Sequence, residues 1–251
     1  MTQTNETNCI LARDCAHAGS PAKCTDRCPH FAQLHSATGR HTRAGLPAKY
    51  ALTTLADAPP RADQPEVYGA IDRVVASFSR QFDAKPAIKS LYLFSAEPGT
   101  GKTTTASGLL NAYLTAHYVG SLKRGQTPKE RPVFFLDVNE WQTHYNRYTR
   151  PGVPDWRKEE AADVYYAWLA RAKVADFAVL DDIGVRGASE AFRGDLHDII
   201  NARVAAEKPT VYTSNIPFAD LAGLYDARLA DRVRDQCLEA PFKGQSKRGR
   251  R

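Results

Sequence analysis

The sequence of 251 residues contains no long apolar run. None of its hydrophobic stretches approaches the ~20 residues that a membrane-spanning helix requires. The first ten residues also lack the basic region followed by an apolar region that marks a secretory signal peptide. From these absences we expect neither a spanning helix nor a secretory leader of the usual kind, and we expect a cytoplasmic protein.

Cysteine is scarce outside the N-terminal part of the chain. Four of the five cysteines lie within the first 28 residues, and the fifth is Cys237. A reducing cytosol disfavours disulfides, so clustered thiols point to a metal, and a tetrahedral zinc would explain how so polar a segment folds. The alternative is free thiols on a disordered tail, because only the second pair of cysteines has the usual zinc-knuckle spacing. The candidate zinc ligands are Cys9, Cys15, Cys24 and Cys28, with His17 or His30 able to replace one thiolate.

The first 45 residues differ from the rest of the chain in composition. They are rich in Cys, His, Thr and Ala, show little hydrophobic periodicity, and could not bury enough apolar surface to fold unaided. Residues 46–64 read as an extended connector that is broken by Pro59 and Pro60. We therefore predict a Cys/His-rich segment over residues 1–45 and a main domain over residues 46–251, which ends in a basic tail.

Strand and helix patterns alternate after this boundary, which predicts an α/β fold with a parallel sheet flanked by helices. The expected strands are 90–95, 132–138, 176–184 and 209–215, with an edge strand at 237–242. The expected helices are 68–82, 102–119, 140–148 with Asn139 as N-cap, 156–173, 189–207 and 218–236, the last in one or two pieces.

The first motif, "SAEPGTGKTT" over residues 95–104, follows a strand and opens a helix, as a phosphate-binding loop does. Gly99 and Gly101 occupy the positions where such a loop requires a positive φ or a close approach of phosphate. Ala96 replaces the first glycine of the strict pattern, at the strand exit, where a negative φ is tolerable. The alternative is a Gly/Pro turn beside a chance lysine. The expected nucleotide-binding residues are Pro98, Gly99, Thr100, Gly101, Lys102 toward the β- and γ-phosphates, Thr103 toward Mg²⁺, and Thr104.

Acidic and amide side chains end two further apolar strands. "FAVLDD" ends in Asp181, which would hold Mg²⁺ through water, and Asp182, which would polarise the attacking water. Neighbouring carboxylates at the end of a buried strand need a cation or solvent to offset their repulsion. Asn215 ends "VYTSN" and could help to position water, although Ser-Asn also commonly ends a strand in a turn. Together these motifs predict binding of ATP or GTP.

The motifs AEPGTGKT, VLDDIG, YTSN, RLADRVRD and FKGQSKR, in this order, resemble the AAA+ helicase loaders of the DnaC and DnaI type, which are related to the IstB-type ATPases. The resemblance covers residues 46–248. It implies an AAA+ P-loop ATPase that binds ATP, assembles with copies of itself, and delivers a hexameric replicative helicase onto single-stranded DNA. It also implies an N-terminal segment that grips the helicase.

The same resemblance assigns catalytic roles to two arginines beside Lys102, Asp182 and Asn215. Arg232 matches the arginine finger that reaches a neighbour's γ-phosphate, with Arg228 as the reserve candidate, and Arg248 matches the sensor-2 arginine. The alternative for the helix that carries Arg232 is an ordinary charged face paired with Asp226, Asp231 and Asp235. Asp182 stands where most AAA+ motors have glutamate, and we expect this shorter carboxylate to suit a slow switch.

The net charge of +6 is a moderate indication of contact with a polyanion. Basic and aromatic residues interleave between residues 121 and 158, which suits single-stranded DNA, although aromatics at helical spacing more often belong to the core. The interleaved residues are Lys123, Arg124, Lys129, Arg131, Arg147, Arg150, Arg157 and Lys158 with Trp141, Tyr145, Tyr148 and Trp156.

Three other functions share some of the nucleotide-site motifs. They are a transposition helper of the IstB type, a small-molecule P-loop kinase, and a nucleic-acid-binding zinc protein with a degenerate ATP site.

Overall fold

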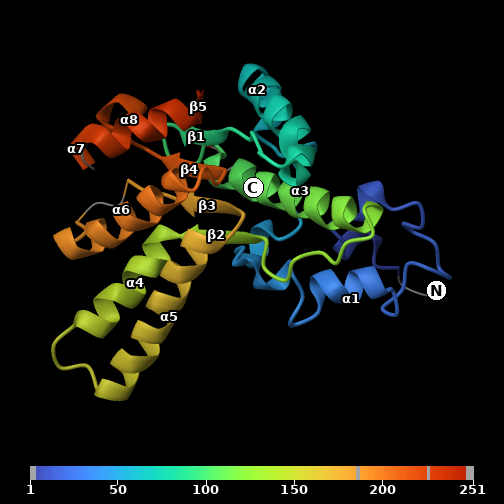
Figure 1. Ribbon diagram of the computed structural model, residues 1–251, viewed down its shortest axis with the longest axis horizontal. Helices are drawn as coiled ribbons and strands as arrows, with labels where there is room; N and C mark the ends of the chain where they lie inside the picture. Colours follow the sequence, from blue (N-terminus) through green and yellow to red (C-terminus); the bar gives the residue numbers. More distant parts are fainter. Residues whose placement is uncertain (1–3, 185–186, 225–226, 247–251) are drawn as a thin grey trace.

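A five-stranded parallel sheet forms the centre of the protein (Figure 1). The computed structural model describes residues 4–184, 187–224 and 227–246. The strand order is β2-β3-β4-β1-β5, and every pair of neighbours is parallel, so the predicted α/β architecture and the edge strand are confirmed. The strands are β1 (Ser90–Phe94), β2 (Val133–Asp137), β3 (Phe177–Asp181), β4 (Thr210–Ser214) and β5 (Cys237–Pro241).

Helices cover both faces of this sheet, and α4 and α5 project from it as an antiparallel pair (Figure 1). The predicted helix at 218–236 is in separate pieces, and residues 225–226 between them lie outside the described part of the chain. The elements of the main domain are α2 (Pro65–Ala76), which continues as a 3-10 helix η6 (Ser77–Phe82), α3 (Lys102–Lys123), α4 (Val138–Thr149), α5 (Asp155–Val174), α6 (Glu190–Ala205), η7 (Phe218–Asp220), α7 (Leu221–Leu224) and α8 (Ala227–Gln236).

Alternating side chains on the strands fill two apolar layers. Leu91 and Leu93 belong to the layer under α2 and α3, whereas Tyr92 between them belongs to the layer under α4, α5 and α6. This alternation follows from the two-residue period of a strand. All five residues of β3 and of β4 are buried, as expected for central strands of a parallel sheet that is covered on both faces.

The expected N-cap of α4 is wrong. The helix begins at Val138, and the carboxylate of Asp137 accepts hydrogen bonds from the backbone N–H groups of Asn139 (3.0 Å) and Glu140 (3.1 Å). Asp137 lies at the strand end, so its side chain already reaches the unpaired amides of the first turn. The side chain of Asn139 is therefore available for another contact.

The N-terminal segment packs on the main domain rather than standing apart from it. It contains short helices, namely η1 (Glu6–Asn8), η2 (Ala12–Asp14), α1 (Pro29–His35) and η3 (Thr42–Ala44), and its Leu11, Leu34 and Ala44 join the apolar layer under α3. The buried guanidinium of Arg40 donates to the backbone carbonyls of Pro128 (2.8 Å) and Lys129 (2.9 Å), just before β2. The main domain thus supplies apolar surface that this polar segment lacks.

The same segment covers the outer side of β2. Its η3 contacts this strand, and the Cα of Gly45 approaches so closely that a Cβ there would lie 2.6 Å from the carbonyl oxygen of Phe135. The connector from residue 46 to residue 64 is also packed and not extended as expected. It forms two short turns, η4 (Ala48–Tyr50) and η5 (Arg61–Asp63), and buries Ala58 and Pro60.

Two histidines between these segments, His117 buried and His35 half-buried, predict a loss of stability in acid. The Nε2 atoms of His35 and His117 accept hydrogen bonds from the backbone N–H groups of Ile10 (3.2 Å) and Lys129 (3.1 Å). Burial lowers the pKa of each imidazole from 6.5 to about 4. The unfolded chain therefore binds more protons than the folded chain over this window, and stability is lost as the pH falls from about 6.5 toward 4.

We expect the melting temperature to fall between pH 7 and pH 5, followed by circular dichroism. Burial raises the pKa of Asp181 to about 6 and gives an opposing but single contribution, because protonation of a carboxyl with a raised pKa favours the folded state. A variant with both His35→Gln and His117→Gln should lose less between the two pH values than the wild type does. An equal loss in both proteins would contradict the role of the two histidines.

No helix among the described residues is long and apolar enough to cross a membrane.

Candidate nucleotide-binding site

The loop between β1 and α3 has the backbone that its sequence predicts. Gly99 and Gly101 have φ values of 75° and 103°, in the left-handed region that favours glycine. Ala96 does not have a positive φ, which explains why alanine is tolerated at the strand exit. Gly101 meets a second constraint, because a Cβ there would lie 2.1 Å from Cγ of Pro60.

Lys102 is the first residue of α3, and its side chain turns back over the loop. Its Nζ donates to the carbonyl oxygens of Ser95 (3.2 Å) and Glu97 (3.3 Å). A phosphate oxygen is a stronger acceptor than a neutral carbonyl, and the N-terminus of a long helix favours an anion. The ammonium is thus held where a phosphate on the loop could take over its hydrogen bonds.

Thr103 and Asp181 bring the loop and β3 together. The Oγ1 of Thr103 donates to both carboxylate oxygens of Asp181, each at 3.1 Å. Asp181 is buried, and burial raises its pKa to about 6, with smaller contributions from the charges of Asp137 and Asp182. Hydroxyl and carboxylate oxygens are the ligands that Mg²⁺ prefers, and a cation there would offset the cost of burying this charge. The residues therefore fit Mg²⁺.

Asp182 has an uncommon backbone conformation. Its φ is 62°, a left-handed value that costs a non-glycine residue on the order of 1–3 kcal/mol. Two contacts hold it, because its backbone N–H donates to Oγ1 of Thr213 (2.8 Å) and its Oδ2 accepts from Nδ2 of Asn139 (2.9 Å). The Thr213 hydroxyl in turn donates to Asp181 (2.7 Å), so one side chain of β4 positions both acids.

Sequence reasoning missed Asn139 and Thr213 as members of this site. The only sequence signal is their place at or beside the carboxyl ends of β2 and β4, which flank β3 in the sheet. The parallel arrangement brings the carboxyl ends of these strands together at one end of the sheet, where ligands of open α/β sheets bind.

Two buried oxygens beside the loop have no hydrogen-bond partner among the described residues. They are Oγ1 of Thr100 and Oδ1 of Asn215. A Cβ on Gly184 would lie 2.6 Å from that Asn215 oxygen, so glycine is needed there for close packing. Buried polar atoms are rarely left unpaired in native proteins, so the pair fits a site that receives a polar ligand with its waters. ATP is a ligand of this kind.

Two of the expected arginines, Arg228 and Arg232, lie on α8 and not on this loop. Arg232 on α8 donates from Nη1 to Oδ1 of Asn201 on α6 (2.8 Å), and Arg228 is exposed one turn earlier. Within the described residues neither arginine forms an ion pair with Asp231 or Asp235. Arg248 and Asp226 lie outside the described residues.

The four N-terminal cysteines are not arranged as a metal centre. No group of three or more His, Cys, Asp or Glu side chains in the described part of the chain is placed to hold a metal ion. Burial raises the pKa of the Cys9 thiol, and the charges of the other three thiols add to that shift, so the four are neighbours. Zinc binding by these thiols remains a prediction.

The aromatic residues near α4 divide into two groups. Trp141 is fully buried and stacks on Tyr165 at 4.6 Å between ring centroids, and Tyr145 and Tyr148 pack beside them, as in the core alternative. Trp156 differs, because 61% of it is exposed near the start of α5, with the guanidinium of Arg157 at 4.9 Å from its ring centre. Of the four expected aromatics, Trp156 alone is exposed for contact with a nucleic acid.

No protein-family description and no curated protein matches the chain. Solved structures do match it. A proposed primosome component of Streptococcus pyogenes serotype M3 is 22% identical, with a TM-score of 0.54, and the match covers 86% of this chain and all of that one (100%). The structure of DnaI is 21% identical, with a TM-score of 0.55 and coverage of 81% of this chain and 94% of that one.

The structure of the DnaC helicase loader is similar to the same degree. It is 20% identical, with a TM-score of 0.54, and the match covers 78% of this chain and 100% of that chain. At this level of identity the likeness establishes the fold. The chain has the fold of the DnaI structure and of the DnaC helicase loader, a parallel sheet flanked by helices.

Proposed function

We propose that the protein is an ATP-dependent loader that places a hexameric replicative helicase on single-stranded DNA and uses ATP hydrolysis as a switch. The observation that carries the proposal is the site itself. The phosphate loop, the Thr103–Asp181 pair and Asp182 meet at one edge of a sheet whose fold is that of DnaI and a DnaC helicase loader.

Each residue of the site has a distinct chemical task in this proposal. Lys102 binds the β- and γ-phosphates, and Thr103 with Asp181 holds Mg²⁺. Asp182 orients and polarises a water, and Asn215 helps to position it. When bound, ATP supplies the phosphoryl group whose loss changes the state of the protein.

The hydrogen bond from Asn139 to Asp182 predicts a restraint on hydrolysis. This bond occupies an oxygen of the carboxylate that could otherwise accept from the attacking water, and a hydrogen bond to a charged group contributes about 1.5–3 kcal/mol. We expect Asn139→Ala to raise the basal rate of phosphate release by roughly three- to tenfold, with little change in ATP affinity, since part of that free energy is regained from water.

Asn146→Ala is the matched control, because Asn146 is an exposed asparagine on the same helix. The double variant Asn139→Ala, Asp182→Asn should have no measurable turnover. An unchanged or lower rate in Asn139→Ala, at unaltered ATP affinity, would show that Asn139 does not restrain Asp182.

We propose that the projecting end of the α4–α5 pair contacts single-stranded DNA. Trp156 and Arg157 offer an exposed ring beside a cation there, and base stacking on an aromatic contributes about 1–3 kcal/mol per base. Trp156→Ala should therefore weaken binding of a labelled oligothymidine about fivefold or more by fluorescence anisotropy, and Arg157→Ala should reduce its salt dependence. Arg80→Ala, a cation on η6, is the control. Equal affinities of the wild type and all three variants for the oligothymidine would show that the α4–α5 pair does not contact DNA.

Assembly and partner binding complete the proposal. Arg232 would leave Asn201 and enter the ATP site of a neighbouring copy, and the N-terminal segment would grip the helicase. The direct test is co-purification with the replicative helicase of the source organism, with and without ATP, for the wild type, Arg232→Ala and Arg228→Ala. We expect an ATP-dependent complex that Arg232→Ala weakens more than Arg228→Ala does. No complex under any condition would overturn the loader function.

A further inference from the structure

One segment of the chain contacts both the N-terminal segment and the nucleotide loop. We call residues 51–64 the strap. The carbonyls of Ala51 and Thr53 accept hydrogen bonds from Nδ2 of Asn111 on α3, at 2.9 and 3.0 Å. Leu55 then lies against Gly108, where a Cβ would be 3.1 Å from its Cδ2. The strap therefore runs along α3 toward the N-terminus of that helix, where the loop ends.

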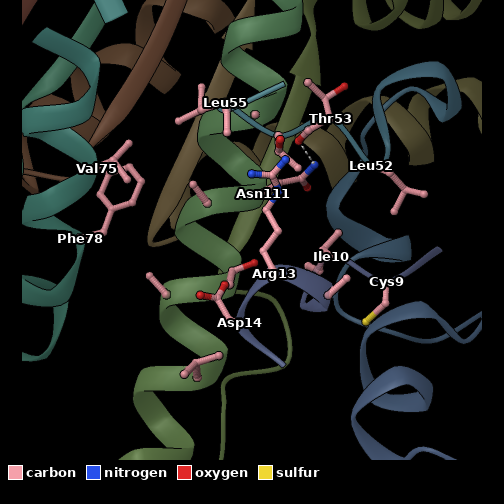
Figure 2. Close-up of a pocket in the computed structure, with 18 of the residues that line it drawn as sticks. Cys9, Ile10, Arg13, Asp14, Leu52, Thr53, Leu55, Val75, Phe78 and Asn111 are labelled. Carbon is pink, nitrogen blue, oxygen red and sulfur yellow. Dashed lines mark hydrogen bonds between the residues drawn. The ribbon is translucent and has the colours of Figure 1, made fainter. Parts of the chain in front are cut away.

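The first part of the strap is fastened to the N-terminal segment. Asp57 forms an ion pair with Arg13 of η2 and also accepts from Oγ1 of Thr54 (2.9 Å). The side chains of Arg13 and Asp57 are 53% and 67% exposed, so a protein that binds this surface can reach the pair. Figure 2 shows Arg13 extending toward the stretch that carries Thr53 and Leu55.

The second part of the strap is fastened to the main domain and touches the loop. The ring of Pro60 packs directly on the Cα of Gly101. Arg61 donates to both carboxylate oxygens of Asp72 on α2 (3.1 and 2.6 Å), and the Gln64 side chain pairs with the backbone of Lys243. Asp57 and Pro60 are three residues apart, at most about 11 Å of chain. A displacement at Asp57 therefore begins close to the contact between Pro60 and Gly101.

Open space on one side of residues 52–57 permits such a displacement. A cavity of about 880 Å³ is bounded by these residues, the N-terminal segment, α2 with η6, and α3 (Figure 2). None of its lining residues belongs to the loop of residues 95–101. Leu55 and Ala58 pack in the apolar layer under α3, and this space adjoins the part of the strap around the Arg13–Asp57 pair.

We propose that the strap couples the N-terminal segment to the nucleotide site, an inference that rests on the proposed binding of ATP. While Arg13 holds Asp57, Pro60 supports Gly101 and the loop is preformed for phosphate. A protein that takes Arg13 away from Asp57 releases the strap and lowers nucleotide affinity. By linkage, bound nucleotide strengthens the docking of the N-terminal segment by the same factor.

Charge reversal across the pair tests this coupling in the full-length chain. The measured quantity is the Kd of a fluorescent ADP analogue for the wild type, Arg13→Asp, Asp57→Arg and the double reversal. Each single reversal should weaken binding about three- to fivefold, which is the range that an exposed ion pair can supply. The double reversal should bind within about twofold of the wild type, because it restores an attractive pair. Lys173→Asp, which breaks the ion pair with Asp198 away from the strap, should leave the Kd unchanged.

The coupling is overturned when both single reversals bind as the wild type does, or when the double reversal fails to recover. Thermal unfolding of each variant separates loss of folding from loss of affinity, and Asp57→Asn, which only removes the charge, replaces any reversal that does not fold. A wild type that fails to bind, or a Lys102→Ala variant that binds equally well, would overturn the proposed nucleotide site and the coupling together. Loss of binding in Lys102→Ala without any effect of the reversals would overturn the coupling alone.

Discussion

Replacing Lys102 with alanine should remove most of the affinity for ATP and nearly all turnover. The ammonium is held by the carbonyls of Ser95 and Glu97, so it lies at the loop before any phosphate arrives. A hydrogen bond to a charged group contributes about 1.5–3 kcal/mol, which corresponds to roughly a 10- to 150-fold loss of affinity. Turnover should fall by a further factor of about 100, because the same charge stabilises the transition state.

Isothermal titration with ATP and Mg²⁺, together with a phosphate-release assay, measures both effects. Lys89→Ala is the control, since Lys89 precedes β1 and its Nζ donates to the carbonyl of Asp235 instead (3.0 Å). Lys102→Ala should keep its melting temperature to within a few degrees, because the lost hydrogen bonds are to two carbonyls near the surface end of the loop, of which that of Glu97 is exposed. Undiminished ATP binding in this variant would exclude the loop as the nucleotide site.

Replacing Arg203 with methionine should produce the largest loss of stability. Its guanidinium is fully buried on α6 and donates to the carbonyls of Ala172 (2.7 Å), Ala175 (2.9 Å) and Pro209 (2.9 Å) and to Oγ1 of Thr210 (2.8 Å). Burial lowers its pKa to about 10, which leaves it charged at neutral pH. Methionine has similar length but donates nothing, so the carbonyls at the end of α5 lose their partner.

We expect a loss of about 3–5 kcal/mol, because a buried acceptor left without a donor costs about 1–3 kcal/mol, several are left at once, and removal of the buried charge offsets part of the sum. In a chain of this size that corresponds to a fall of roughly 10 °C or more in melting temperature. Arg193→Met is the matched control, because Arg193 is an exposed arginine of the same helix that also donates to a carbonyl, that of Ala188 (2.9 Å). A fall in Arg203→Met no larger than that of the control would contradict the structural role of Arg203.

The parts of the fold that the sequence predicts are those set by neighbouring residues. The order of strand, glycine loop and helix around Lys102 depends on apolar periodicity and on the positive φ of two glycines, and both are local properties. The positions of Asp181, Asp182 and Asn215 are predictable because Asp181 ends one apolar strand, Asp182 follows it, and Asn215 follows another. In a parallel sheet those strand ends share one edge.

The parts that could not be predicted depend on contacts between distant residues. Asn139 reaches Asp182 across 43 positions, and Pro60 meets Gly101 across a similar interval. Arg203 reads in the sequence as one more charge on an exposed helix face, because nothing near it in the chain indicates the carbonyls it meets. The shift of the α4 N-cap from Asn139 to Asp137 has a different cause, because two residues of good capping type stand two positions apart.

The packing of the N-terminal segment against β2 has a consequence for the free edges of the sheet. An uncovered edge strand presents unpaired N–H and C=O groups that can template pairing with another chain. Here β2 is the strand at one edge and lies under η3 and Gly45, whereas β5 at the other edge carries Pro241, which has no N–H to donate, and exposed Glu239. The N-terminal segment therefore also prevents another chain from pairing with β2. A chain shortened to begin at Leu46 would expose this strand and tend to aggregate through it.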